Sequence, residues 1–185
     1  LSTLRRELGR MRASHGKLAV RGNWDTWYWS RLPLLRGTGF RWVHRQRLTR
    51  RIRGQLIQIV GLSYRDGESG RDARRLLAGA DPRGWRIMLY HTPDLVLRTP
   101  AADLYLAGHT HGGQVALPLF GALVTLSVHG KRFERGLRRL PGDRAAPGPG
   151  RARYIYVNPG LGVEPIIPLR LGVRPEITVF ELTPK

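Results

Sequence analysis

Residues 103–114 read DLYLAGHTHGGQ, a short apolar run that leads into two histidines bracketed by glycines. The apolar half predicts a buried strand, and catalytic residues of open α/β sheets gather where such strands end. In an extended backbone alternate side chains point the same way, so His109 and His111 can face one site. Glycine lets the backbone approach a bound ion closely. We interpret this stretch as the centre of a metal site rather than as a solvated turn with two incidental histidines.

Two further strand ends support this interpretation. Residues 20–25, VRGNWD, follow a short apolar strand and form a Gly-Asn turn. Residues 86–94, RIMLYHTPD, place a histidine at the exit of another strand, before a proline that stops regular continuation. Asn23 and His91 therefore join the two histidines as expected ligands. Imidazole nitrogens and an amide oxygen suit a divalent ion such as Mn, Zn or Fe.

These motifs resemble those of the calcineurin-like metallophosphoesterase superfamily, whose motif order is D-x-H, GD-x-x-D, GN-H-D/E, a lone His and GH-x-H. The last three occur here in that order, as GNWD at 22–25, His91 and GHTH at 108–111. The tail, with YVNPGLG at 156–162 and RPEI at 174–177, is similar to a bacterial, often membrane-associated branch described as similar to UDP-2,3-diacylglucosamine pyrophosphatases.

The resemblance implies a hydrolase of phosphodiester or pyrophosphate bonds that uses two divalent ions, with a phosphorylated small molecule, a nucleotide sugar or a lipid-linked compound as substrate. It implies that Asn23, His91 and His109 ligate one ion and that His111 ligates the other. It also implies an α/β fold in which two facing mixed sheets are flanked by helices.

The chain departs from the family because D-x-H and GD-x-x-D are absent from its 185 residues. In the family these motifs precede the GN motif and supply the bridging aspartates. We therefore expect residues 1–185 to be a single domain that lacks its first βαβ portion. At most one of the two ions would be retained, and the activity of this stretch would be impaired.

Three residues beside the expected ligands are candidates for other roles. Trp24 stands where many members carry a histidine that protonates the leaving oxygen, and indole cannot exchange a proton near neutral pH. We interpret it either as a substrate contact or as an aromatic plug beside the site. Arg21 is a candidate contact for substrate phosphate, with a surface salt bridge as the alternative. Asp94 is a candidate partner for the second nitrogen of a ligating histidine.

Composition limits the possible partners. The chain has 32 basic and 13 acidic residues and a formal net charge of +19, which favours anionic partners. It has no cysteine, so disulfides and thiolate ligands are excluded. No apolar run reaches the roughly 18 to 20 residues of a membrane span. The expected location is the cytoplasm or the periphery of the bacterial membrane, with an anionic membrane surface as a further expected partner.

Apolar periodicity predicts the secondary structure. The expected helices cover residues 1–13, 25–35 and 68–78. The expected strands of the first sheet cover residues 17–21, 40–43, 55–62, 85–90 and 103–106, with a basic connection before residue 55. The expected strands of a second, more antiparallel sheet cover residues 114–117, 131–137, 153–157 and 177–182. Residues 141–150 form a Pro/Gly-rich loop.

Two other functional classes remain as alternatives. A catalytically degenerate binding or scaffold domain of the same fold is favoured by the absent aspartates and Trp24, and disfavoured by the intact histidine pair. A nucleic-acid-binding module is favoured by charge alone, and no recognition signature supports it, so no specific nucleic-acid partner is expected. The basic connection carries a cluster that suits either a solvated face or contact with anionic phospholipid: Arg45, Arg47, Arg50, Arg51 and Arg53.

Overall fold

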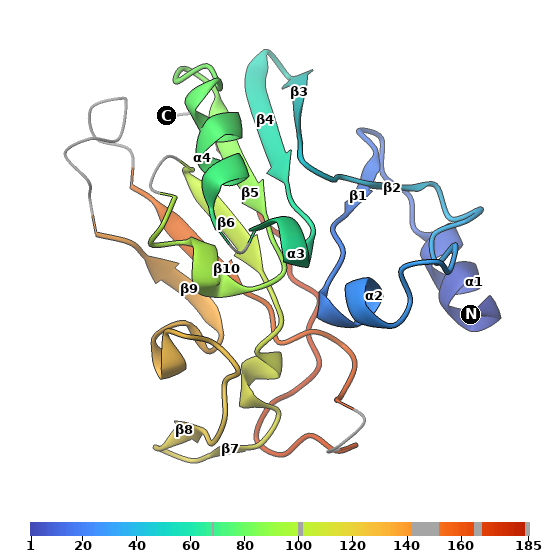
Figure 1. Cartoon of the computed structure of the whole chain (residues 1–185), viewed down its shortest axis with the longest axis vertical. Coiled ribbons are helices and arrows are strands. Elements are labelled where there is room, and N and C mark those ends of the chain that lie inside the picture. The colour runs from blue at the N-terminus through green and yellow to red at the C-terminus, as the bar shows by residue number, and fades with distance from the viewer. Residues whose placement is uncertain (68, 100–101, 142–151, 165–167, 184–185) are drawn as a thin grey trace.

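A mixed six-stranded sheet forms the centre of the computed structural model, which describes residues 1–67, 69–99, 102–141, 152–164 and 168–183 (Figure 1). Its strand order is β3-β4-β5-β6-β10-β9. The strands of the described part are β1 (Lys17–Ala19), β2 (Phe40–Trp42), β3 (Gln46–Ile52), β4 (Gln55–Gly61), β5 (Trp85–Leu89), β6 (Leu104–Ala107), β7 (Ala116–Leu117), β8 (Gly121–Ala122), β9 (Gly136–Arg139) and β10 (Tyr154–Val157). The helices are α1 (Ser2–Arg10), α2 (Asn23–Trp27), α3 (Tyr64–Gly67), α4 (Arg71–Ala78), η1 (Pro93–Leu95), η2 (His111–Gly113) and η3 (Gly130–Phe133).

The inner strands β4, β5, β6 and β10 run parallel, and β3 and β9 close the two edges in antiparallel pairing. Parallel strands are buried on both faces and therefore read as continuous apolar runs. Residues 154–157, YIYV, fit this rule, since three of the four are buried. The carboxyl ends of the parallel strands consequently meet at one edge of the sheet.

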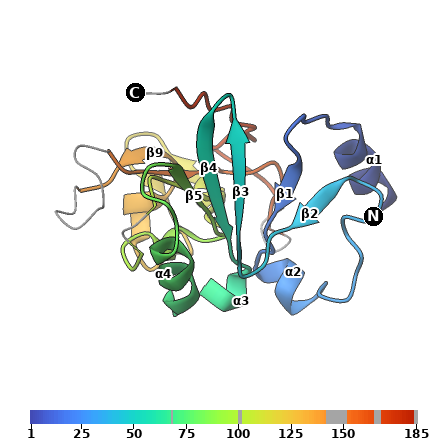
Figure 2. The ribbon, with the colours of Figure 1, turned by 90° about the horizontal axis from the view of Figure 1, so that it is seen from above.

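The crossover from β4 to β5 places α3 and α4 on one face of the sheet (Figure 2). In α4, Ala73 and Leu77 are four residues apart and therefore share a helical face. Both are buried in the main apolar cluster, together with Val60 of β4 and Met88 of β5. The opposite face is covered by the C-terminal segment, where Phe180 packs edge-on against Tyr156 at 4.9 Å between ring centroids.

The first 42 residues form a separate layer beside the main sheet. Here β1 and β2 pair in parallel with each other, and Figures 1 and 2 both place them with α1 and α2 to one side of β3. The helix predicted for residues 1–13 is present as α1, but none of its residues is buried. The position of this layer matters for function because its GN turn reaches the edge where the parallel strands end.

The basic connection predicted before residue 55 is wrong, because residues 46–52 form β3 and pair with β4. Arg53 and Gly54 join the two strands, with φ values of 48° and 76°. Positive φ at both central residues is typical of the tight turns that match the twist of a hairpin. The arginines therefore lie on or beside a paired edge strand.

The predicted distribution of strands between two sheets also needs correction. Tyr154–Val157 pairs in parallel with β6 inside the main sheet, and β9 begins at Gly136 after the 3-10 helix η3. Residues 177–182 form no strand, and residues 114–117 contribute a bridge between Val115 and Leu171 and one strand of the short ladder between β7 and β8. The α/β class with a mixed sheet, further small sheets and flanking helices is confirmed, consistent with a metallophosphoesterase-like sandwich.

The predicted helix over residues 25–35 is shorter than expected. It covers only Asn23–Trp27, and Pro33 would in any case interrupt a longer one because proline lacks a donor N–H. The predicted loop at residues 141–150 lies, from residue 142 onward, outside the described residues. Within the described ranges, no helix has both the length and the apolar character needed to cross a bilayer.

Candidate metal centre

Three chain segments converge at the carboxyl edge of the parallel sheet. The Gly108 N–H donates to the His91 carbonyl at 2.9 Å, which ties the exit of β6 to the exit of β5. On the other side, the Asn158 N–H donates to the Ala107 carbonyl at 2.8 Å. The chain reversals after β5 and β6 therefore bring His91 and the GHTHGGQ segment together.

The GN turn contributes Asn23, which is 6% exposed at the start of α2. Its side-chain oxygen lies 2.7 Å from Nε2 of His91. A Cβ at Gly22 would lie 2.8 Å from the His91 ring, so only glycine permits this approach. The Asp25 carboxylate accepts a hydrogen bond from the Gly22 N–H at 2.8 Å and thereby caps the helix. Asn23 and His91 are thus fixed against each other by local structure.

The histidine pair adopts a strained backbone rather than an extended one. The φ values of His109 and His111 are 71° and 51°, and residues other than glycine rarely occupy this region. Gly113, with φ of 84°, passes so close to Ala122 that a Cβ would lie 2.1 Å from that side chain. Such strain costs about 1–3 kcal/mol per residue and is concentrated at functional sites. The expectation that an extended backbone points both histidines at one site is therefore wrong.

His109 faces His91, with 5.0 Å between the ring centroids. Its Nε2 lies 3.1 Å from the Leu126 carbonyl, which can only accept a hydrogen bond, so Nε2 carries the ring proton. Nδ1 is then left with a lone pair, and it is buried with no hydrogen-bond partner among the residues that the structure describes. A ligating histidine commonly donates its other N–H to a backbone carbonyl in this way.

His111 faces a different group of residues. Its Nδ1 lies 3.0 Å from the side-chain oxygen of Gln114, which also accepts from the Glu164 N–H at 2.7 Å. That second contact identifies the Gln114 atom as the oxygen, so His111 donates from Nδ1 and keeps Nε2 bare. Nε2 lies 3.8 Å from the Glu164 carboxylate, which accepts hydrogen bonds from the Trp24 indole N–H at 2.9 and 3.2 Å.

Burial keeps the first two histidines neutral. It is the largest cause that lowers the pKa of His91 from 6.5 to about 3, followed by the charges of His109 and His111. Burial also lowers the pKa of His109, partly offset by its hydrogen bond to the Leu126 carbonyl and by the Asp94 charge. Neutral imidazole is the form that binds metal.

The donor set fits one divalent ion in part. Asn23 Oδ1 and His91 Nε2 lie 2.7 Å apart in a hydrogen bond that Nε2 donates, because an amide oxygen only accepts, so an ion held by both atoms would take the place of that proton. The orphaned Nδ1 of His109 is the third donor. Among the residues that the structure describes, however, no group of three or more histidine, aspartate or glutamate side chains is assembled to hold an ion.

The other two candidate residues, Arg21 and Asp94, are each held by hydrogen bonds of their own. The Arg21 guanidinium donates to the Ser30 carbonyl at 3.0 Å and lies 5.0 Å from the Trp42 ring. The Asp94 carboxylate accepts from the Ser127 hydroxyl at 2.7 Å and from the Val128 N–H at 3.2 Å. A substrate role for Arg21 and a ligand-orienting role for Asp94 stay predictions.

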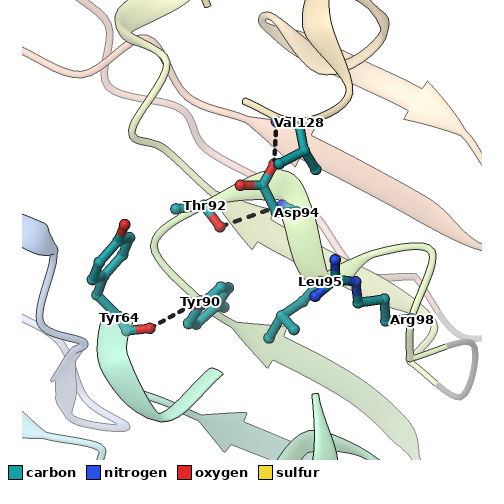
Figure 3. Close-up of a pocket in the computed structure, with 7 residues that line it drawn as sticks. All are labelled: Tyr64, Tyr90, Thr92, Asp94, Leu95, Arg98 and Val128. Atoms are coloured by element: carbon teal, nitrogen blue, oxygen red, sulfur yellow. Dashed lines mark hydrogen bonds between the residues drawn. The ribbon is translucent and has the colours of Figure 1, made fainter. Parts of the chain in front are cut away.

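A pocket of about 180 Å³ lies beside Thr92 and Asp94, in the segment that follows His91 (Figure 3). Its lining residues are Tyr64, Tyr90, Thr92, Asp94, Leu95, Arg98 and Val128. Tyr64, one of these lining residues, has its ring centroid 6.1 Å from those of both His91 and His109. Sequence reasoning missed Tyr64 and Glu164 because each comes from a segment without a motif, whereas Gln114 stood inside the GHTHGGQ string.

Comparison with known proteins supports the same assignment. The chain is 34% identical over 182 residues to an uncharacterized metallophosphoesterase, YkuE, of Bacillus subtilis, covering 95% of this chain and 59% of the relative. It is 40% identical over 99 residues to the Escherichia coli phosphodiesterase YaeI, covering 52% and 32%. It is 30% identical over 138 residues to the UDP-2,3-diacylglucosamine pyrophosphatase LpxG of Chlamydia muridarum, covering 71% and 38%.

The chain therefore spans less than two thirds of the length of these three relatives. No protein-family model matches it. No solved structure matches it significantly. With the GN turn, the lone histidine and the GHTHGGQ segment assembled at one sheet edge, and with these relatives, the chain belongs to the calcineurin-like metallophosphoesterase superfamily.

Proposed function

We propose that this chain forms part of the active site of a metal-dependent hydrolase that cleaves phosphodiester or pyrophosphate bonds. The observation that carries the proposal is the protonation pattern of the histidine pair. His109 donates from Nε2 to the Leu126 carbonyl and His111 donates from Nδ1 to Gln114, so each ring keeps one bare nitrogen. Two imidazoles held in defined tautomers on a strained backbone are suited to ligation, whereas incidental surface histidines are not so constrained.

In this proposal Asn23, His91 and His109 would hold one ion, Mn, Zn or Fe, and His111 would contribute to a second. Bound divalent ions would polarise the phosphoryl oxygens and lower the pKa of a water molecule. Because the sequence lacks D-x-H and GD-x-x-D, we infer that these 185 residues alone retain at most one ion and hydrolyse substrate poorly.

Two properties of the chain's own residues bear on the reaction: the protonation state of the buried histidines and the chemistry of Trp24. Burial holds His91 and His109 neutral, so they need not lose protons before they bind an ion. Trp24 cannot protonate a leaving oxygen, and its indole N–H is engaged with Glu164. The site therefore favours substrates whose leaving group departs without help from a general acid at this position.

For the substrate we propose a lipid-linked or nucleotide-sugar pyrophosphate. The support is the name of the LpxG relative and the net charge of +19, which attracts anionic compounds. The corresponding location is the cytoplasm or the periphery of the membrane.

The test is metal content and hydrolysis measured on the complete protein. With Mn present, it should hydrolyse bis-p-nitrophenyl phosphate, whereas residues 1–185 alone should stay near background and bind at most one ion weakly. Robust turnover by residues 1–185 would overturn the role given to the absent aspartates. A complete protein that binds no metal and hydrolyses nothing would overturn the proposal itself.

A degenerate binding domain of the same fold is the second candidate. The observation that favours it is the absence, among the described residues, of an assembled group of three or more histidine and carboxylate side chains. Metal analysis of the complete protein separates the two candidates, because a degenerate domain would stay metal-free even with the upstream region in place.

A further inference from the structure

An uncharged apolar segment follows the histidine pair directly. Residues 115–128 read VALPLFGALVTLSV, and we call residues 117–128 the apolar loop. Its large side chains project into solvent, with Leu119 fully exposed and Val128 72% exposed. The exposed apolar residues of the loop are Leu117, Leu119, Phe120, Leu123, Val124, Leu126 and Val128. Large exposed apolar patches on soluble proteins commonly mark surfaces that contact another protein or a membrane.

The loop is a built structure with a buried inner side. Ala116 and Ala122 pair across β7 and β8 and are 4% and 0% exposed. The Glu134 carboxylate accepts a hydrogen bond from the Ala122 N–H at 3.2 Å, which anchors the loop to the domain. Leu119 and Leu126 have positive φ values of 64° and 52°, a strained conformation for a leucine. The fold therefore holds these leucines outward at a cost in conformational energy.

A neighbouring segment extends the apolar surface. The Ala116 N–H donates to the Leu171 carbonyl at 2.8 Å, so the chain around Leu171 lies directly beside the base of the loop. Leu169 and Leu171 are both more than half exposed. At the lower end of the molecule in Figure 1, β7 and β8 lie beside an orange-red segment of the chain, before the chain turns up toward its C-terminus.

Cationic side chains flank the loop. Lys131 donates to the Phe120 carbonyl at 2.7 Å, and its ammonium lies 3.1 Å from the centre of the Phe120 ring. Arg132 is exposed on the same short helix, η3. The one acidic residue of this stretch, Glu134, turns inward to Ala122. An apolar surface with a cationic border is complementary to an anionic phospholipid surface, where each basic residue contributes about 1 kcal/mol of attraction.

The loop is also part of the metal centre. The Leu126 carbonyl is the group that fixes the tautomer of His109. A cavity of about 220 Å³ lies between them, lined on its polar side by the histidine pair and Glu164 and on its apolar side by Val124 and Leu126. A phosphate group on an apolar chain could therefore reach the histidines while its chain stays against the loop.

We propose that the apolar loop inserts into the surface of an anionic phospholipid bilayer and presents the cavity beside His109 and His111 to a phosphate carried by a lipid. The docking surface stands on its own observations, whereas the lipid-linked substrate rests on the proposed function. Docking at this surface gives a function to a strained, uncharged loop next to the site.

The test is cosedimentation of the complete protein with vesicles of phosphatidylcholine, with or without phosphatidylglycerol. Binding should require phosphatidylglycerol, and the double variant Leu119→Ser/Phe120→Ser should weaken it by at least about tenfold, because two large apolar side chains lose their burial. The matched control is Ile177→Ser/Val179→Ser, which removes two equally exposed apolar side chains elsewhere and should leave binding unchanged. Thermal unfolding should confirm that both variants fold.

Further measurements distinguish failure of the docking proposal from failure of the proposed function. The variant Lys131→Gln/Arg132→Gln should weaken binding to the anionic vesicles. Hydrolysis of soluble bis-p-nitrophenyl phosphate should be unchanged in the loop variant, so loss of vesicle binding with retained hydrolysis supports docking. Retained hydrolysis without any wild-type vesicle binding overturns docking alone, whereas vesicle binding without hydrolysis overturns only the proposed function. A dimer that dissociates in the loop variant and does not bind vesicles would assign the surface to a second copy and overturn the proposal.

Discussion

The neighbouring strands β5 and β6 have polar side chains at both ends, and the two ends are built in opposite ways. At the amino ends, Arg86 and Asp103 are 2% and 1% exposed. The Asp103 carboxylate accepts hydrogen bonds from the Arg86 backbone N–H at 2.8 Å and from its guanidinium at 3.1 and 2.8 Å. At the carboxyl ends, His91 and His109 face each other at 5.0 Å, and His109 keeps a buried nitrogen without a partner.

The difference separates stability from function. A buried charged group is tolerated when its partner satisfies it fully, as at the Arg86 end. The histidine end instead holds neutral imidazoles, an unsatisfied nitrogen and residues at positive φ, all of which reduce the free energy of unfolding. A buried nitrogen lone pair that no hydrogen bond satisfies becomes an advantage only when something binds to it, so the carboxyl ends of β5 and β6 mark the candidate site.

The largest expected effect on stability concerns the amino ends of β5 and β6, where Arg86 pairs with Asp103. Arg86→Met should lower the free energy of unfolding by about 3–5 kcal/mol, because it removes the guanidinium that offsets the charge of the buried Asp103 carboxylate. The double variant Arg86→Met/Asp103→Leu should recover part of this loss, since it removes both charges. Urea unfolding measures both values. If Arg86→Met is as stable as wild type, the ion pair between Arg86 and Asp103 does not stabilise the fold, and the contrast between the two ends of these strands fails.

The next effect concerns the histidines that follow the carboxyl ends of the parallel strands. In the complete protein, His109→Ala and His111→Ala should each lower hydrolysis of bis-p-nitrophenyl phosphate by at least about 100-fold, through loss of a ligand. Each should change the free energy of unfolding far less than Arg86→Met. The control is His129→Ala, since His129 packs edge-on against Phe133 at 5.4 Å and should matter little for hydrolysis. Equal losses from all three variants would contradict the assignment.

The third prediction concerns how the free energy of unfolding depends on pH through His91. Burial lowers the pKa of His91 to about 3 in the folded protein from 6.5, so the unfolded chain binds more protons between these values. Stability of the metal-free protein should therefore fall as the pH drops below about 6.5, by up to about 1.4 kcal/mol per pH unit for this residue. Urea unfolding of wild type and His91→Gln from pH 7 to pH 4 tests this. Parallel curves would show that His91 does not titrate as its burial requires.

The smallest expected effect concerns the arginine cluster, at the end of the molecule opposite the apolar loop (Figure 1). Arg45 pairs with Asp72 at 2.8 Å, and Arg47 donates to the Leu76 carbonyl at 2.6 Å, so both are engaged with α4. Changing all five arginines to glutamine should alter binding to anionic vesicles by less than about twofold, because charges far from a bilayer are screened within about 10 Å. If the variant with all five arginines changed no longer binds the vesicles, the membrane contact lies at the arginine cluster and not at the apolar loop.

The sequence predicted the strands of the site better than it predicted the sheets. β4, β5 and β6 were predicted because each is a mostly apolar run, which is typical of a buried parallel strand. β3 was missed because five arginines in nine positions suggest a solvated connection, and only pairing with β4 makes them an edge strand. Residues 154–157 were predicted as a strand but assigned to the wrong sheet, since apolar character does not specify a partner.

The sequence by itself determined the family motifs, the α/β class and the identity of the expected ligands, because these depend on residue type and local order. Tertiary structure alone decided which atoms are available. The bare nitrogens of His109 and His111 follow from the Leu126 carbonyl and from Gln114 and Glu164, and these contacts form only when distant segments pack together. The outward apolar loop has the same origin: its composition is visible in the sequence, but its exposure depends on which alanines the fold buries beneath it.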